Sequence, residues 1–283
     1  MAGTLYIVAT PLGNLQDLTP RAAATFGSVD FIAAEDTRVT LKLLNHLGLK
    51  KPMVSYYEHN LKERGQMILA RIAAGENCAL CSDAGMPAIS DPGEVIVRDA
   101  LAAGIRVVPV PAAAACVTAL AVSGLPTGRF VFEGFLPTNR RQKAERIAEL
   151  QGEKRTILFY EAPHKLPGTL RDLCEAFGPD RPLTIARELT KLHEEIRPTT
   201  LGEAAAYYAE NTPRGEFVLV MGGAPDEPEA APATPEDGAA LARRLMEEEG
   251  LSPAAAAKEA AGRTGANRRQ IYKALLEGEE ETE

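Results

Sequence analysis

The chain has 283 residues, of which 45% are hydrophobic and 25% charged, a balance that supplies buried cores for two compact domains. Tryptophan is absent and aromatic residues make up only 5%, which argues against a binding surface built from stacked aromatic rings. The net charge of −8 argues against a general nucleic-acid binder, although an acidic C-terminus contributes much of this sum and the distribution of charge matters more.

The sequence shows no sign of export or of membrane attachment. Its N-terminus has no basic stretch followed by an apolar one, and no run approaches the roughly 20 apolar residues of a membrane span. The four cysteines do not form a disulfide framework, which fits a reducing compartment. We therefore expect a cytoplasmic protein that makes no membrane contact.

In the first part of the chain, short apolar runs alternate with helical patterns. This alternation predicts an α/β fold with a parallel sheet covered by helices. The predicted strands are residues 4–9, 29–34, 77–81 and 105–110, and the predicted helices are residues 20–26, 61–74 and 92–103. Thr19 and Asp91 stand in N-cap positions, each followed by a proline at the first helical position. Gly-Leu-Pro-Thr-Gly at residues 124–128 then indicates that an N-terminal domain, residues 1–126, ends there.

Residues 127–224 predict a second α/β domain, with a mixed sheet. Its predicted strands are residues 129–135, 155–160, 183–187, 194–199 and 216–221, with a helix at residues 164–176. The Pro-, Ala- and acid-rich residues 225–235 are typical of a linker. Three short helices follow within residues 236–277, and the turn Gly265-Ala266-Asn267 before the last helix favours a helix-turn-helix module. Residues 278–283 form an acidic tail.

Four loops follow predicted strands of the first domain, and open parallel sheets bind ligands beyond the carboxyl ends of their strands. They are residues 10–15 (TPLGNL), 35–38 (EDTR), 82–93 (SDAGMPAISDPG) and 109–115 (PVPAAAA). The third loop favours a binding role because it is long, its two glycines let the backbone approach a ligand, and Asp83 can accept hydrogen bonds. The other three leave a plain turn, a helix cap and a close packing contact open as alternatives.

Charged residues also recur at the predicted strand ends of the second domain. The segments are residues 132–137 (FEGFLP), 160–164 (YEAPH), 186–191 (ARELTK) and 214–216 (RGE). Each alone is typical of a solvated surface, but their repetition at one sheet edge indicates a site. By contrast, Cys78 and Cys81 are predicted to be core residues on opposite faces of one strand, and no second Cys/His pair completes a metal site.

Seven of these motifs occur in a fixed order between residues 3 and 223: TPLGNLQDLTPRA, AAEDTR, SDAGMPAISDPG, FEGFLP, FYEAPHKL, ARELTK and RGEFVLV. With them, the chain resembles the tetrapyrrole-methylase superfamily, and within it the small-subunit ribosomal RNA (cytidine-2′-O)-methyltransferase I family. The resemblance implies a two-domain tetrapyrrole-methylase-like fold with a small C-terminal helical module, S-adenosyl-L-methionine in the cleft between the domains, and a homodimer. It also implies 2′-O-methylation of a cytidine in the decoding region of 16S ribosomal RNA.

The resemblance further implies which residues bind the cofactor: Leu12, Asp83, Met86, Ala114 and Ala115 from the first domain, and Tyr160, Ala186, Gly215 and Glu216 from the second. One departure stands in the fourth loop, where the family usually has Pro-Gly and this chain has Pro111 followed by Ala112. If that position requires a positive φ, alanine there costs on the order of 1 kcal/mol or reshapes the loop.

A methyl transfer to a ribose oxygen depends mainly on alignment of the reacting atoms, assisted by a group that accepts the hydroxyl proton. The candidates for this assistance are Asp36, Arg38, Glu161, Arg187, Glu188 and Lys191. Arg38, Arg187 and Lys191 are alternatively placed to hold phosphates.

Two basic clusters are candidates for RNA contacts. The predicted RNA-binding residues are Arg140 and Arg141, beside Lys143 and Arg146, and Arg263, Arg268, Arg269 and Lys273 in the C-terminal module. A solvated basic helix face is the alternative. Two other functions also stay open: a methyltransferase of a tetrapyrrole or protein substrate, and a non-catalytic RNA-binding protein on a methylase scaffold.

Overall fold

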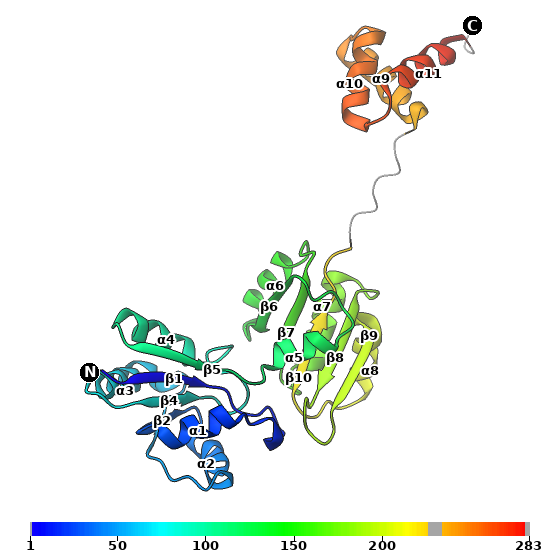
Figure 1. The fold of residues 1–283 in the computed structure, drawn as a ribbon. Helices are drawn as coiled ribbons and strands as arrows, with labels where there is room; N and C mark the ends of the chain where they lie inside the picture. The colour runs from blue at the N-terminus through cyan, green and yellow to red at the C-terminus, as the bar shows by residue number, and fades with distance from the viewer. Residues whose placement is uncertain (1, 226–233, 281–283) are drawn as a thin grey trace. The chain divides into compact units, whose positions relative to one another are not determined.

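The computed structural model describes residues 2–225 and 234–280 and separates the chain into two compact units, Met1–Ala224 and Pro225–Glu283 (Figure 1). Residues 226–233 of the predicted linker and residues 281–283 of the predicted acidic tail lie outside the described residues. In the described part of the chain, no helix is long and apolar enough to cross a membrane.

The first sheet of the larger unit is parallel throughout, as predicted. Its order is β3-β2-β4-β1-β5, with β1 at Thr4–Val8, β2 at Phe31–Ala34, β3 at Met53–Ser55, β4 at Cys78–Cys81 and β5 at Arg106–Val110. Because β1 and β4 lie at its centre, the loops that follow them leave the middle of the carboxyl edge, where binding residues were expected.

Helices cover both faces of this sheet (Figure 1). α3 (Leu61–Ala73) and α4 (Gly93–Ala102) pack on one face, and α1 (Pro20–Ser28) and α2 (Thr37–His46) pack on the other. Cys78 belongs to the first hydrophobic cluster and Cys81 to the second, which confirms that they are core residues on opposite faces. Burial raises the pKa of the Cys81 thiol to about 12, so this group stays protonated at neutral pH.

The second sheet is mixed, as predicted, in the order β6-β7-β10-β8-β9. Its strands are β6 (Phe130–Phe135), β7 (Thr156–Glu161), β8 (Pro182–Arg187), β9 (Glu195–Thr200) and β10 (Phe217–Met221). β6 and β7 are parallel, whereas β10 is antiparallel to both β7 and β8, and β9 is antiparallel to β8.

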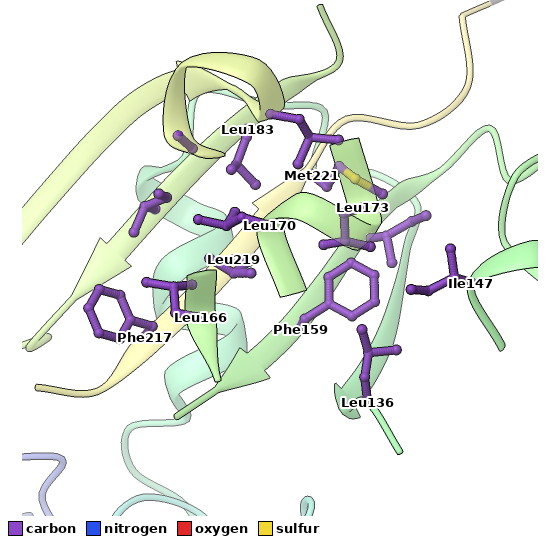
Figure 2. Packing of buried hydrophobic residues seen from close by; sticks show 14 of the residues in the cluster. Leu136, Ile147, Phe159, Leu166, Leu170, Leu173, Leu183, Phe217, Leu219 and Met221 are labelled. Atoms are coloured by element: carbon purple, nitrogen blue, oxygen red, sulfur yellow. The ribbon is translucent and has the colours of Figure 1, made fainter. Parts of the chain in front are cut away.

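One face of the second sheet carries the larger core, in which Phe159 and Leu219 pack against apolar side chains of α6 (Arg140–Glu149), α7 (Leu166–Phe177) and α8 (Leu201–Glu210) (Figure 2). α5 (Ala115–Val122) covers the other face, where its Ala119 and Leu120 contact Val218 and Val220 of β10. α5 therefore packs against the second sheet, although it precedes residue 126.

The smaller unit consists of three helices, α9 (Pro235–Glu249), α10 (Pro253–Thr264) and α11 (Arg268–Glu280), around a small core rich in alanine. Gly265 ends α10 with φ +72°, a left-handed conformation that favours glycine. Asn267 then accepts a hydrogen bond from the Arg269 amide at 2.9 Å. The predicted turn into the last helix is thereby confirmed.

Local patterns gave no prediction for β3, α6 and α8. β3 has only three residues, and α6 buries only Ile147 and so shows almost no apolar stripe. The predicted start of α4 was wrong by one residue, because the helix begins at Gly93 rather than at Pro92. Asp91 nevertheless acts as a local cap, since its carboxylate accepts hydrogen bonds from the amides of Gly93 at 2.7 Å and Ala88 at 2.8 Å.

Candidate functional site

A cavity of about 420 Å³ lies within the larger unit, between the carboxyl edge of the first sheet and the ends of β6 and β7. Its first wall comes from the loops after β1, β2, β4 and β5, and its second from β6, β7 and the start of β10. The lining residues are Leu12, Glu35, Ser82, Asp83, Ala84, Gly85, Met86, Ile89, Ser90, Asp91, Ala114, Ala115, Phe135, Tyr160, Glu161, Ala162, Pro163, Glu216 and Phe217.

The loop at residues 82–93 is held by its own hydrogen bonds and by the loop after β1. Thr10 and Gly85 exchange two backbone hydrogen bonds, of 2.9 and 3.0 Å, and the Thr10 hydroxyl donates to the Ser82 carbonyl at 3.2 Å. Ala88 and Ser90 have φ angles of +67° and +63°, a conformation that costs energy outside glycine. A strained backbone persists only where surrounding contacts maintain it, and strained residues are often found at binding sites.

Three carboxyl groups surround the first wall of the cavity. Glu35 accepts a hydrogen bond from the Asp83 amide at 3.3 Å, and Asp83 accepts one from the Asp36 amide at 3.1 Å. Burial raises the pKa of Glu35, Asp83 and Asp91, because desolvation disfavours their charged forms. A cationic ligand placed among them would relieve this penalty, so the wall suits a positively charged molecule.

Tyr160 joins the second sheet to the start of α5. Its hydroxyl accepts a hydrogen bond from the Cys116 amide at 3.0 Å, and that amide is one of the first donors of α5, which have no partner within the helix. Its ring makes edge-to-face contacts with Phe132 and Phe135, at centroid distances of 4.9 and 5.7 Å. Burial raises the pKa of Tyr160 despite the amide hydrogen bond, which lowers it, so the group remains a neutral phenol.

Glu161 is the acidic residue at the end of β7. It is only 5% exposed, and its carboxylate accepts hydrogen bonds from the Ala162 amide at 2.9 Å and the Thr169 hydroxyl at 2.6 Å. Of the six candidates for assistance, all in the described part of the chain, Glu161 alone lines the cavity.

Asp36 and Arg38 lie beside the site at the start of α2. Asp36 caps the helix by accepting a hydrogen bond from the Arg38 amide at 2.8 Å. The hydrogen bond from the Arg38 guanidinium lowers the pKa of Asp36 to about 2. Capping is therefore a real role of Asp36, and the Arg38 side chain, 88% exposed, stands out from the surface.

The remaining candidates form ion pairs around the end of β8. Arg187 pairs with Glu195 on the adjacent strand at 2.9 Å, and Lys191 bridges Glu188 at 2.9 Å and Glu216 at 3.1 Å. The hydrogen bond from Lys191 lowers the pKa of Glu188. This network borders the cavity through Glu216, which lines it.

Seven of the nine cofactor-binding candidates line the cavity, and two do not. Ala186 is fully buried in the hydrophobic cluster under α5. Gly215 lies against Glu188 with φ +92°, where a Cβ would come within 2.5 Å of Glu188 Cγ. The altered fourth loop causes no backbone penalty, because Ala112 is not among the described non-glycine residues with positive φ.

Several lining residues were not predicted as site residues, among them Glu35, Ser90, Asp91, Phe135 and Ala162. All of them lie within the sequence motifs at strand ends, so the motifs located the site but did not show which side chains face the cavity. Gly134 on β6 lies close to one of these residues: it has φ +62°, and a Cβ there would lie 2.9 Å from Ser90 Oγ.

The predicted RNA-binding residues lie in three different surroundings. Arg141 pairs with Glu145 at 2.8 Å, and Arg263 pairs with Glu259 at 3.0 Å, so acidic neighbours offset these two charges. Arg140 lines a groove between α6 and α7. Arg268, Arg269 and Lys273 are exposed on α11.

Comparisons with known proteins agree with this geometry. Residues 4–205 match the family described as Tetrapyrrole (Corrin/Porphyrin) Methylases, and residues 232–279 match the RsmI C-terminal HTH domain. The protein named Ribosomal RNA small subunit methyltransferase I of Synechocystis sp. is 50% identical over 275 residues, covering 97% of this chain and 98% of that relative. The protein of the same name from Xylella fastidiosa is 47% identical and covers 95% of this chain and 98% of its own length.

The chain belongs to the ribosomal RNA small subunit methyltransferase I family. It is therefore a methyltransferase that depends on S-adenosylmethionine, and the readings as a tetrapyrrole or protein methyltransferase, or as a non-catalytic RNA binder, are not favoured. The predicted fold class is confirmed by a solved structure, uroporphyrin-III C-methyl transferase from Thermus thermophilus complexed with S-adenyl homocysteine. The TM-score is 0.53 at 20% identity, over 78% of this chain and 97% of that one.

Proposed function

We propose that this member of the family methylates the 2′-hydroxyl of a cytidine in the decoding region of 16S ribosomal RNA, with S-adenosylmethionine bound in the cavity between the two sheets. The observation that carries the proposal is the position of Glu161, a buried carboxylate that lines this cavity and is held at both oxygens. Such a group can accept the proton of a ribose hydroxyl.

The residues present fit the cofactor. The cavity volume of about 420 Å³ lies within the range of about 300–1,000 Å³ usual for small-molecule sites. Leu12, Met86, Ala114 and Ala115 supply apolar walls, and Tyr160 adds an aromatic one. The carboxyl groups with raised pKa values complement the sulfonium and ammonium charges of S-adenosylmethionine.

When bound, S-adenosylmethionine supplies an electrophilic sulfonium methyl group that the ribose 2′-oxygen can take, with S-adenosylhomocysteine as the leaving group. The chain contributes orientation and proton acceptance. The strained loop at residues 82–93 and the Tyr160–Cys116 hydrogen bond fix the cavity walls, which favours alignment of the reacting atoms. Glu161 orients the acceptor hydroxyl and takes its proton as the new bond forms.

The remaining polar candidates are proposed to act on the RNA backbone or on the shape of the site. Arg38, which is exposed, and Arg187 suit phosphate contacts beside the cavity. Asp36 and the Glu188–Lys191 pair maintain the loops that carry these arginines. Gly13 lies against the Lys191 side chain, where a Cβ would collide with Lys191 Cγ, so Lys191 also packs on the loop after β1.

The organisation of the chain is also part of the proposal. Residues 1–126 and 127–224 would form the two cofactor-binding domains, residues 225–235 a linker and residues 236–277 a module that contacts RNA phosphates through Arg268, Arg269 and Lys273. Arg140 and Arg141 would add a second contact. A homodimer in the cytoplasm acting on the small ribosomal subunit is the expected working state, as implied by the resemblance of the motifs.

The test is a labelling experiment. The purified protein is incubated with radiolabelled S-adenosylmethionine and small ribosomal subunits that lack this modification, and the label is mapped after digestion of the RNA. Label on a cytidine 2′-oxygen is the expected result. Absence of label on RNA, with cofactor binding demonstrated by calorimetry, would overturn the proposed substrate.

A further inference from the structure

Behind Glu161 lies a chain of side chains from three different elements. The Thr169 hydroxyl of α7 donates to Glu161 Oε2 at 2.6 Å, and Lys143 Nζ of α6 donates to the same hydroxyl oxygen at 2.9 Å. Lys143 is held in turn by an ion pair with Asp172 at 2.8 Å, one turn further along α7. Lys143 thus belongs by sequence to the basic cluster of α6 but by structure to the support of the site.

The order of donors fixes the direction of these hydrogen bonds. An ammonium group has donors and no acceptor, so Thr169 Oγ1 must accept from Lys143. The single proton of the hydroxyl is then left for Glu161, and Thr169 cannot turn that proton elsewhere without losing a bond. Thr169 is 1% exposed, which keeps competing water away from this junction.

These hydrogen bonds fix the orientation of the Glu161 carboxylate. Oε2 receives the Thr169 hydroxyl and Oε1 receives the Ala162 amide, so both oxygens act as acceptors and the plane of the group is fixed. A carboxylate oxygen can accept more than one hydrogen bond, so capacity remains for a substrate hydroxyl. Both contacts suit the ionised carboxylate that a proton acceptor must be.

We infer that Thr169 and Lys143 are positioning residues, which hold Glu161 in the orientation needed for methyl transfer. This inference rests on the role proposed above for Glu161. Neither residue lines the cofactor cavity, so both act through Glu161 rather than on the reacting atoms. Lys143 also lies 26 residues from Thr169, so no local sequence pattern connects them.

The test compares Thr169→Val with Thr169→Ser in steady-state kinetics. Valine keeps the shape but removes the donor, so kcat should fall about tenfold to a hundredfold, within the usual contribution of a positioned proton acceptor. The KM and Kd for S-adenosylmethionine should stay unchanged. Serine restores the donor and should recover most of the rate, and Lys143→Met should lower kcat in the same way as Thr169→Val.

Matched controls separate positioning from simple packing. Thr184→Val removes another buried hydroxyl of the larger unit, one on β8 that donates to the Ser123 carbonyl at 2.8 Å. Lys51→Met removes an ammonium that donates to the Val29 carbonyl at 2.7 Å. Both should leave kcat unchanged. A crystal structure of Thr169→Val should show the Glu161 carboxylate rotated or in two orientations.

Three results would overturn the inference: wild-type kcat in Thr169→Val, equal losses in Thr169→Val and Thr169→Ser, or an unmoved carboxylate in the Thr169→Val structure. The proposed function fails in a different way, because the wild-type protein itself would then leave the RNA unlabelled. An active wild type with an unaffected Thr169→Val protein rejects the positioning role alone.

Discussion

The ends of β7 and β8 lie in one sheet and carry similar sequences of charged residues, yet the structure uses them differently. At the end of β7, Glu161 is buried, lines the cavity and receives its hydrogen bonds from an amide and a hydroxyl. At the end of β8, Arg187 pairs with Glu195 and Glu188 pairs with Lys191, outside the cavity lining.

This comparison shows that charge at a strand end does not by itself identify a catalytic group. A carboxylate that pairs with a cation has its charge satisfied within the protein, whereas one held by neutral donors keeps a charge that can act on a substrate. The partners of the side chain, rather than its type or its place on the strand, distinguish the two roles.

The largest effect is expected at the β7 end. Glu161→Gln keeps the size of the side chain but removes proton acceptance, so kcat should fall on the order of a hundredfold or more. Steady-state methylation of unmodified subunits measures the loss in kcat, and calorimetry should show unchanged cofactor affinity. Glu133→Gln is the matched control, since Glu133 has a buried side chain in the same sheet and pairs with Arg146. Equal losses of kcat in both variants would show that Glu161 is no more important for the reaction than the ion-paired Glu133.

Tyr160→Phe tests the wall next to Glu161. The change leaves the Cys116 amide without its acceptor, and an unsatisfied buried donor costs about 1–3 kcal/mol of the free energy of unfolding. Urea unfolding measures this loss, and S-adenosylmethionine should bind more weakly because the start of α5 borders the cavity. Tyr208→Phe, whose ring packs on Phe217, is the control in the same unit. Unchanged stability in Tyr160→Phe would show that water replaces the hydroxyl.

A smaller effect is expected at the β8 end. Because Arg187 is proposed to contact a phosphate, Arg187→Ala should raise the KM for RNA by about tenfold or less and leave kcat nearly unchanged. Steady-state kinetics at two salt concentrations measure it. Arg155→Ala, which breaks an ion pair with Glu153, provides the control. A loss confined to kcat and as large as that of Glu161→Gln would instead place Arg187 among the catalytic residues.

The smallest effect concerns pH. A carboxyl group with a raised pKa takes up its proton at a higher pH than usual, so attraction of Glu35, Asp83 and Asp91 for a cationic cofactor is lost as pH falls through those raised values. As the pH is lowered, cofactor affinity should therefore begin to decline at pH values above the ordinary pKa range of carboxyl groups. In this pH interval, cofactor binding should release protons. Calorimetry in buffers of different ionisation enthalpy measures both. Glu153→Gln is the control that leaves the profile unchanged, because Glu153 does not line the cavity and the hydrogen bond from Arg155 lowers its pKa to about 2. Binding without proton release would contradict this account.

The sequence by itself determined the two kinds of sheet, the capped start of α1 at Thr19 and Pro20, the separation of Cys78 and Cys81 onto opposite faces, and the loops that form the cavity. These features follow from the periods of helix and strand and from local capping, which act over a few residues. The order of the motifs also indicated the family.

Only the tertiary structure decided which side chains within those loops meet. The hydrogen-bonded series Glu161–Thr169–Lys143 joins three elements. α5 packs on the second sheet through Leu120, and Arg187 forms an ion pair with Glu195. Each is a contact between segments whose separation along the chain no periodicity encodes. A side chain's charge and hydrogen-bonding capacity are fixed by its type, but the group that satisfies them is fixed by the packing of distant elements, and that packing selects the residue free to act on a substrate.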